Sequence, residues 1–223
     1  MSYPITRHFV LPFLKKYITS IKGQKNLPEY NPFIVAANHI SQTDPFFIFT
    51  TLFPKYKKKI HFIANRGNYG SIFERLIASK WAGCILLDPK NKKDSVKKAI
   101  KLIEKNKLVG IFPEGERVPD SNDLRRGKTG VIRIALESKV PILPIGIITK
   151  GEKHRIKRGD LHSLGWDALN HYGIKGHRTK LVIGKPISLE KYYNQPVTYE
   201  LLRKLTNLVM EELAKLSGKQ YNY

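Results

Sequence analysis

The feature that most constrains the fold of this chain is an alternation between short apolar runs and segments with helical spacing of apolar residues. Apolar runs bounded by Gly, Pro, Asn or Asp predict buried strands. They lie at residues 32–37, 59–64, 83–88, 108–113, 140–148 and 180–187. The helical spacing predicts helices that start near Asp44, Ser95, Thr129 and Thr198. Such alternation is typical of α/β proteins, so we expect residues 29–223 to form a single α/β domain with a mixed, mostly parallel sheet flanked by helices.

The N-terminal segment, residues 1–28, has a different pattern. Apolar residues between Phe9 and Ile21 recur at helical spacing, and lysines occupy the other side of the predicted amphipathic helix. A basic face opposite an apolar one suits an anionic membrane surface, although a helix docked on the core would show the same pattern. No secretory leader is recognisable, and no apolar run approaches the roughly 18 residues that span a bilayer. We expect residues 1–28 to be a membrane-association element on the cytoplasmic face of the cell membrane, without a transmembrane helix.

The charge balance restricts the possible partners. Forty Lys and Arg residues against 18 Asp and Glu give a formal net charge of +22, which attracts polyanions. Nucleic acid, an anionic membrane and a phosphate-bearing substrate all satisfy this field. Lysines at 55, 57–59 and 90–107 favour nucleic acid, but no recognised nucleic-acid-binding motif accompanies them, and we expect no such partner. The single cysteine, Cys84, lies in an apolar run and is expected to be a packed thiol.

The first motif with chemical potential is NHISQTD at residues 38–44, between the first predicted strand and the helix that follows it. Asp44 is suited to the N-cap of that helix and Pro45 to its first position. Catalytic groups gather at such strand ends in α/β sheets. A carboxylate on one nitrogen of His39 would fix its tautomer and leave the other nitrogen free to take a proton. The alternative is a capping Asp44 beside an unrelated surface histidine.

The second motif is FPEGER at residues 112–117, directly after another predicted strand. Pro113 and Gly115 favour a tight turn, from which Glu114 and Arg117 would project opposite charges into one region. The planar guanidinium of Arg117 is suited to bind a phosphate. A solvated turn with a local ion pair is the alternative.

Together these motifs resemble those of the glycerolipid acyltransferases, typified by 1-acylglycerol-3-phosphate acyltransferase. NHISQTD is similar to the catalytic block of that family, GCILLD to its second block, FPEGER to its third and VPILPIGI to its last. Lys128 and Gly130 are similar to a Lys-x-Gly element, and the resemblance extends from about residue 33 to 148. Four blocks in the family's order are much more specific than any one of them.

The resemblance implies a reaction. His39 would deprotonate a hydroxyl of 1-acylglycerol-3-phosphate (lysophosphatidic acid), which attacks the thioester of acyl-CoA or an acyl carrier protein to give phosphatidic acid. Asp44 would orient His39. The resemblance implies no metal and no cofactor, and it assigns the glycerol phosphate to Glu114, Gly115, Arg117 and Lys128.

Departures from the family's blocks concern the acceptor. The second block ends in Asp88, Pro89 and Lys90 instead of Asp-Arg, so the phosphate contact of that arginine is expected to pass to Lys90 or Lys92. Asn65 stands where the family has a phosphate-binding lysine, and the next residue, Arg66, is expected to replace it. Glu116 stands in place of a threonine. A different glycerol phosphate or lysophospholipid therefore remains an alternative acceptor.

A serine enzyme of the penicillin-binding type is a further alternative. Ser95-Val96-Lys97-Lys98 and Lys128-Thr129-Gly130 imitate two of the three motifs of that class. We expect the match to be accidental, because the middle motif is missing and Ser95 is suited to cap the helix that follows it.

Overall fold

The computed structural model describes residues 12, 15–29, 32–41, 43–68, 71–118, 121–150 and 178–223. Within them the strands form a seven-stranded sheet in the order β1-β7-β6-β2-β5-β3-β4. The strands are β1 Ile18–Lys22, β2 Ile34–Ala37, β3 Ile60–Asn65, β4 Ile85–Leu87, β5 Leu108–Ile111, β6 Ile142–Lys150 and β7 Arg178–Ile183. Neighbouring strands are parallel except for β6 and β7, which are antiparallel. The expected mixed, mostly parallel α/β sheet is confirmed.

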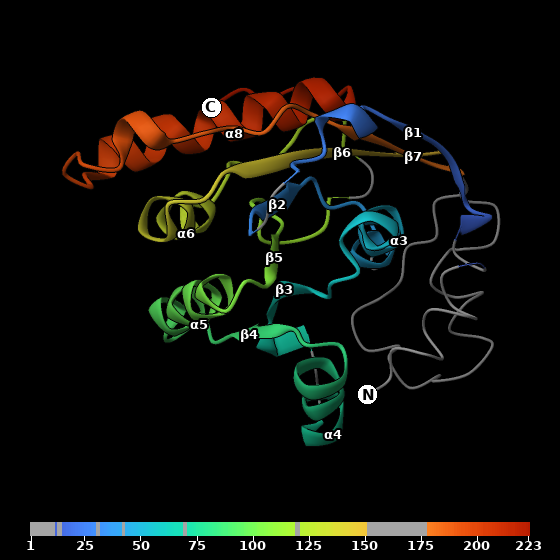
Figure 1. Cartoon of the computed structure of the whole chain (residues 1–223), viewed down its shortest axis with the longest axis horizontal. Coiled ribbons are helices and arrows are strands. Elements are labelled where there is room, and N and C mark those ends of the chain that lie inside the picture. Colours follow the sequence, from blue (N-terminus) through green and yellow to red (C-terminus); the bar gives the residue numbers. More distant parts are fainter. Residues whose placement is uncertain are drawn as a thin grey trace.

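Helices cover both faces of this sheet, as parallel strands require. The α-helices are α3 Asp44–Tyr56, α4 Ile72–Leu76, α5 Lys92–Glu104, α6 Gly130–Ser138 and α8 Tyr199–Ser217. Helices α5, α6 and α8 lie on one face and α3 on the other (Figure 1). The residues of β2 alternate accordingly: Ile34 and Ala36 pack in the core under α5, α6 and α8, whereas Val35 and Ala37 pack in the core under α3. No helix among the described residues combines the length and apolar character that a membrane span requires.

The helix starts differ from expectation at two positions. Helix α3 begins at Asp44 with Thr43 as its N-cap, so the prediction that Asp44 is the N-cap is wrong by one residue. Helix α5 begins at Lys92 after the N-cap Asn91. Ser95 therefore lies inside its first turn and donates a 2.7 Å hydrogen bond to the Lys92 carbonyl instead of capping the helix. The prediction for Thr198 is confirmed, because it is the N-cap of α8 and its hydroxyl accepts from the Leu201 amide at 3.1 Å.

The predicted N-terminal helix is wrong where the structure describes its last residues. Ile18–Lys22 form β1, which pairs in parallel with the edge strand β7. The pairing register shifts between Ile18 and Ser20, so the strand holds one extra residue there. Ile18 and Ile21 consequently pack against the same core although they are three residues apart, and this spacing imitates a helix. Residues 1–11, 13 and 14 lie outside the described residues. So does the segment between Lys150 and Arg178, whose sequence has no clear period and predicts a long loop.

Candidate active site

The expected contact between His39 and Asp44 is present at the carboxyl end of β2. The Oδ2 atom of Asp44 lies 2.8 Å from Nδ1 of His39. The same oxygen accepts hydrogen bonds from the backbone amides of Ile40 at 2.7 Å and Ser41 at 2.8 Å. One carboxylate oxygen therefore holds the loop between β2 and α3 in place. Asp44 is fully buried, whereas the His39 side chain remains 17% exposed. Because the carboxylate keeps the ring proton on Nδ1, Nε2 carries the lone pair that can accept a proton.

Two residues distant in sequence hold the loop that carries His39. The side chain of Asn38 donates to the Ile147 carbonyl at 3.0 Å and accepts from the Ile147 amide at 2.7 Å, which fastens the end of β2 to β6. The carbonyl of His39 accepts from the Val118 amide at 2.8 Å. The backbone on both sides of the imidazole is therefore fixed by neighbouring strands and their loops.

Glu114 takes a position that differs from the expected substrate contact. Its Oε1 accepts the His39 amide at 2.9 Å and its Oε2 accepts the Arg125 amide at 3.2 Å. The residue is 2% exposed, and burial raises the pKa of its carboxyl against the opposing effect of these hydrogen bonds. The alternative of a solvated turn is therefore excluded for Glu114, and its contact with the glycerol phosphate stays a prediction. Its geometry positions the backbone of His39.

Aromatic rings support the imidazole from one side. The His39 ring stacks on Phe112 with centroids 3.9 Å apart, and Phe112 stacks on Phe62 at 5.4 Å. The position of Phe62 depends on Gly110 in β5, because a Cβ atom there would overlap the Phe62 ring. Stacking and the bond to Asp44 together leave the imidazole little rotational freedom.

Two exposed cations, Arg117 and Lys128, lie in the loop after β5 and belong to the surroundings of His39 and Asp44. Arg117 immediately precedes Val118, whose amide contacts the His39 carbonyl, so its backbone lies beside the histidine loop. The side chain of Lys128 lies directly over Gly115: the backbone of Gly115 has a φ of +77°, and a Cβ atom there would overlap the lysine ammonium. The structure therefore brings His39, Asp44, Glu114, Gly115, Arg117 and Lys128 to one edge of the sheet.

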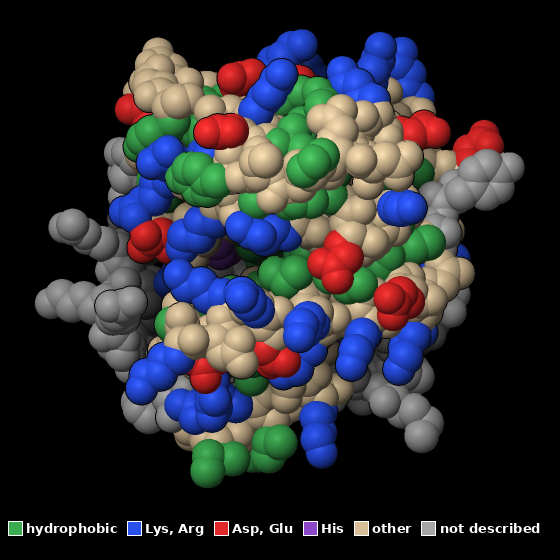
Figure 2. Space-filling model, turned by 90° about the vertical axis from the view of Figure 1, so that its left-hand side faces the viewer, with side chains coloured by type: hydrophobic (Ala, Val, Ile, Leu, Met, Phe, Trp, Pro, Cys, Tyr) green, Lys and Arg blue, Asp and Glu red, His purple; other side chains and the backbone are tan. Residues whose placement is uncertain are grey.

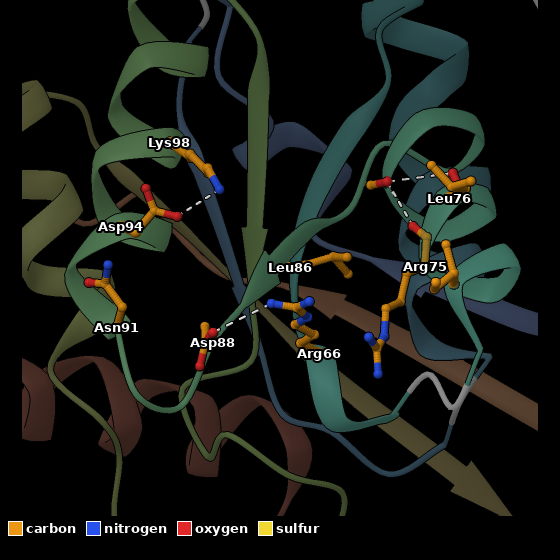
Figure 3. Close-up of a pocket in the computed structure, with 10 residues that line it drawn as sticks. Arg66, Arg75, Leu76, Leu86, Asp88, Asn91, Asp94 and Lys98 are labelled. Atoms are coloured by element: carbon orange, nitrogen blue, oxygen red, sulfur yellow. Dashed lines mark hydrogen bonds and ion pairs between the residues drawn. The ribbon is translucent and has the colours of Figure 1, made fainter.

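Arg66 and Lys90 lie farther along that edge. They follow β3 and β4, which are two and three strands from β2 in the sheet, or roughly 10 and 14 Å at the usual strand spacing. Arg66 pairs with Asp88 at 3.5 Å and lines an open cavity of about 380 Å³ (Figure 3). The backbone amide of Lys90 donates to Asp88 at 2.9 Å, and its side chain is exposed. The structure separates these two residues from the six around His39.

Sequence reasoning missed three residues that shape this edge. Asn38 directly follows an apolar strand. An amide side chain next to a strand that is expected to be buried was the available signal in the sequence. The stacking of Phe112 on His39 has no signature in the sequence. Arg75 lines the same cavity as Arg66, but it lies on α4, which was not predicted.

The electrostatic surroundings suit an anionic ligand. On the face that carries α5 and α6, Lys and Arg side chains greatly outnumber Asp and Glu (Figure 2). A histidine held by a carboxylate at the carboxyl edge of a parallel sheet, with two exposed cations beside it, is the arrangement expected of an enzyme that performs acid-base chemistry on an anionic substrate.

Comparisons with known proteins identify the family of this enzyme. The model of the acyltransferase family matches residues 19–148. The chain is 26% identical over 219 residues to 1-acyl-sn-glycerol-3-phosphate acyltransferase of Bacillus subtilis, covering 92% of this chain and 94% of that protein. It is 28% identical over 205 residues to the Mycoplasma genitalium protein named "Probable 1-acyl-sn-glycerol-3-phosphate acyltransferase", covering 87% of this chain and 72% of that protein.

A solved structure shares the fold. The crystal structure of the 1-acyl-sn-glycerophosphate acyltransferase PlsC from Thermotoga maritima matches with a TM-score of 0.59 at 21% identity, covering 99% of this chain and 84% of that one. The chain belongs to the acyltransferase family, and the resemblance expected from its four motifs is confirmed.

Proposed function

We propose that this protein transfers a fatty acyl group from a thioester donor to the free hydroxyl of 1-acylglycerol-3-phosphate, giving phosphatidic acid for phospholipid synthesis. The observation that carries the proposal is the 2.8 Å contact between His39 and Asp44 next to the exposed cations Arg117 and Lys128. The names of the relatives in Bacillus subtilis and Mycoplasma genitalium support the same acceptor.

The proposed reaction follows from the contact of His39 Nδ1 with Asp44, which leaves Nε2 for the substrate. Nε2 of His39 takes the hydroxyl proton as the acceptor oxygen attacks the thioester carbonyl. The tetrahedral intermediate then collapses, the carbon-sulfur bond breaks, and the thiolate leaves with the proton from the imidazolium. Asp44 stabilises the transient imidazolium charge. A base of this kind accelerates a reaction by roughly 10²–10⁴-fold. This chemistry uses no metal or cofactor.

The proposed binding roles follow the charges. Arg117 grips the acceptor phosphate with its planar guanidinium, and Lys128 adds a second positive charge beside it. Gly115 gives Lys128 room to lie over the turn. Arg66 and Lys90 serve the more distant anionic groups of acceptor or donor. Both acyl-CoA and an acyl carrier protein are acidic, so the basic surface suits either donor.

The acceptor is a lipid, so the enzyme must work at a membrane surface. We place it as a peripheral protein on the cytoplasmic face of the cell membrane, held by residues 1–28 and by its positive charge. Residues 18–22 of this segment also belong to the sheet.

The test is acyl transfer by the purified protein, with labelled acyl-CoA and labelled acyl carrier protein in separate reactions and a panel of glycerol phosphates and lysophospholipids. We expect phosphatidic acid from 1-acylglycerol-3-phosphate, and no turnover by the folded His39→Ala variant. Substantial turnover by that variant would remove His39 from the role of base. A preferred acceptor other than 1-acylglycerol-3-phosphate would retain the reaction and change the substrate.

The phosphate assignment has its own measurement. Arg117→Ala should raise the acceptor KM by about tenfold or more, because a charge-assisted hydrogen bond is worth about 1.5–3 kcal/mol. The matched control is Lys185→Ala, which removes an exposed positive charge beside the N-terminal half of β6, at the opposite edge of the sheet. Equal KM values for the two variants would place the phosphate elsewhere.

A further inference from the structure

The short helix α4 exposes an unusual amount of apolar surface. Ile72 is 75% exposed, Phe73 66% and Leu76 46%. Ile72 has the largest exposed fraction among the exposed large hydrophobic residues of the described chain. Three large apolar side chains in a five-residue helix form a compact patch, which has no structural role in the core and indicates a binding surface.

The position of α4 relates this patch to the active site. The helix follows β3 and projects beyond the β4 edge of the sheet (Figure 1). The carboxyl end of β3 lies at the same edge as the carboxyl end of β2, which carries His39. Phe46 is also 47% exposed, and it lies two residues after Asp44 in the first turn of α3. Exposed apolar side chains therefore follow two strands at the catalytic edge.

Three positively charged side chains lie near the patch. Arg75 on α4 and Arg66 after β3 both line the cavity between α4 and α5 (Figure 3), and the side chain of Lys80 is exposed one turn after Leu76. The acids that line this cavity are engaged with cations: Asp88 with Arg66 at 3.5 Å and Asp94 with Lys98 at 2.6 Å. Hydrophobic side chains project at the lower edge of Figure 2, at the level of α4, next to Lys and Arg side chains. An apolar tip with a basic rim complements an anionic lipid surface.

We propose that α4 is a second membrane-contacting element of this enzyme, which inserts Ile72, Phe73 and Leu76 into the interfacial region of an anionic bilayer. The inference rests on the proposed lipid acceptor. Residues 1–28 are the first proposed membrane contact, and α4 adds a second one from the α/β domain. This contact turns the His39 edge toward the leaflet, where the glycerol hydroxyl of the acceptor lies. A second copy of the chain is a poorer occupant, because two surfaces from chains of net charge +22 repel each other.

The test measures the depth of α4 directly in the full chain. In a Cys84→Ser background, Phe73→Cys is labelled with an environment-sensitive fluorophore, and the protein is added to phosphatidylcholine vesicles with and without phosphatidylglycerol. The matched control is the same label at Tyr199→Cys, which is equally exposed at 65% but lies at the start of α8, far from α4 in Figure 1. We expect the label at 73 to shift to the blue and to be quenched by brominated acyl chains, and the label at 199 to remain in water.

A binding measurement complements the fluorescence. Ile72→Ser combined with Phe73→Ser should weaken binding to the phosphatidylglycerol vesicles by about tenfold or more, since each buried apolar side chain of this size is worth roughly a factor of ten. Val197→Ser combined with Tyr199→Ser should have little effect. A label at 73 that stays in water on vesicle-bound protein, or a chain that does not bind these vesicles, would overturn the proposal. Concentration-dependent self-association lost in the α4 double variant, without quenching, would assign the patch to a second copy and also overturn it.

Activity separates this inference from the proposed function. With a short-chain acceptor below its micellar concentration, Phe73→Ser alone, which leaves the cavity that Ile72 and Arg66 line unchanged, should turn over at the parental rate, whereas with acceptor in vesicles its rate should fall. Equal rates on vesicles would refute the α4 contact and leave the acyltransferase intact. Absence of turnover by the parent on either form of acceptor would instead refute the proposed function.

Discussion

Replacing Asp44 with asparagine separates the charge of this side chain from its shape. One oxygen of Asp44 accepts hydrogen bonds from three donors: the ring of His39 and the amides of Ile40 and Ser41, at 2.7–2.8 Å. An asparagine oxygen can still accept all three, but it carries no negative charge. The loop geometry should therefore persist while the imidazolium loses its ionic partner.

The magnitude follows from the burial of the pair. Asp44 is fully buried, so its attraction for the imidazolium is little screened by solvent. A pair of unit charges near 4 Å interacts by about 4 kcal/mol at an effective dielectric constant of about 20. Loss of that stabilisation corresponds to a fall in kcat of about 10³-fold, since each 1.36 kcal/mol of barrier is roughly tenfold in rate. Three charge-assisted bonds that become neutral ones should also lower the free energy of unfolding by about 2–3 kcal/mol.

The assay is steady-state acyl transfer at saturating donor, with thermal unfolding followed by circular dichroism. Asp44→Asn should lower kcat with little change in the acceptor KM, because Arg117 and Lys128 are untouched. Asp44→Ala should destabilise the fold further, since it removes the acceptor for Ile40 and Ser41. Glu137→Gln, the corresponding change at an exposed carboxylate of α6, serves as the control. A kcat of Asp44→Asn within about threefold of the parent would refute the claim that the charge of Asp44 drives proton transfer.

Two further changes test the supports of the site, and a third tests how the buried His61 affects stability. Glu114→Gln should lower kcat and leave the acceptor KM unchanged, because an amide accepts through only one oxygen and the backbone of His39 or Arg125 loses its partner; a KM effect alone would support substrate contact instead. Gly110→Ala should displace the Phe62 ring and, through Phe112, the imidazole, lowering the free energy of unfolding by about 1–3 kcal/mol, as measured by urea denaturation. The Nδ1 atom of His61 lies 2.7 Å from the Gly83 carbonyl oxygen, and burial lowers the pKa of this imidazole. As the pH falls, His61 of the unfolded chain is therefore protonated before His61 of the folded chain, so the free energy of unfolding should decrease below about pH 6.5. His61→Gln should make this decrease smaller. An unchanged pH dependence of stability in this variant would contradict the prediction.

The sequence by itself determined six of the seven strands of the described sheet and the residues of the candidate catalytic loop. The contact between His39 and Asp44 spans five residues in one strand-turn-helix unit, and its local geometry follows once β2 and α3 form. Apolar runs specified the buried strands because parallel strands are covered on both faces.

Only the tertiary structure decided how distant segments meet. The bonds from Asn38 to Ile147 and from His39 to Glu114 span 109 and 75 residues. Glu114 could not be recognised as a support for the histidine loop until the strand order placed β5 beside β2. The same order inserts β5 between β2 and β3 and so moves Arg66 away from His39. Strand order and the pairing of β1 with β7 are long-range outcomes of packing, which local periodicity does not encode.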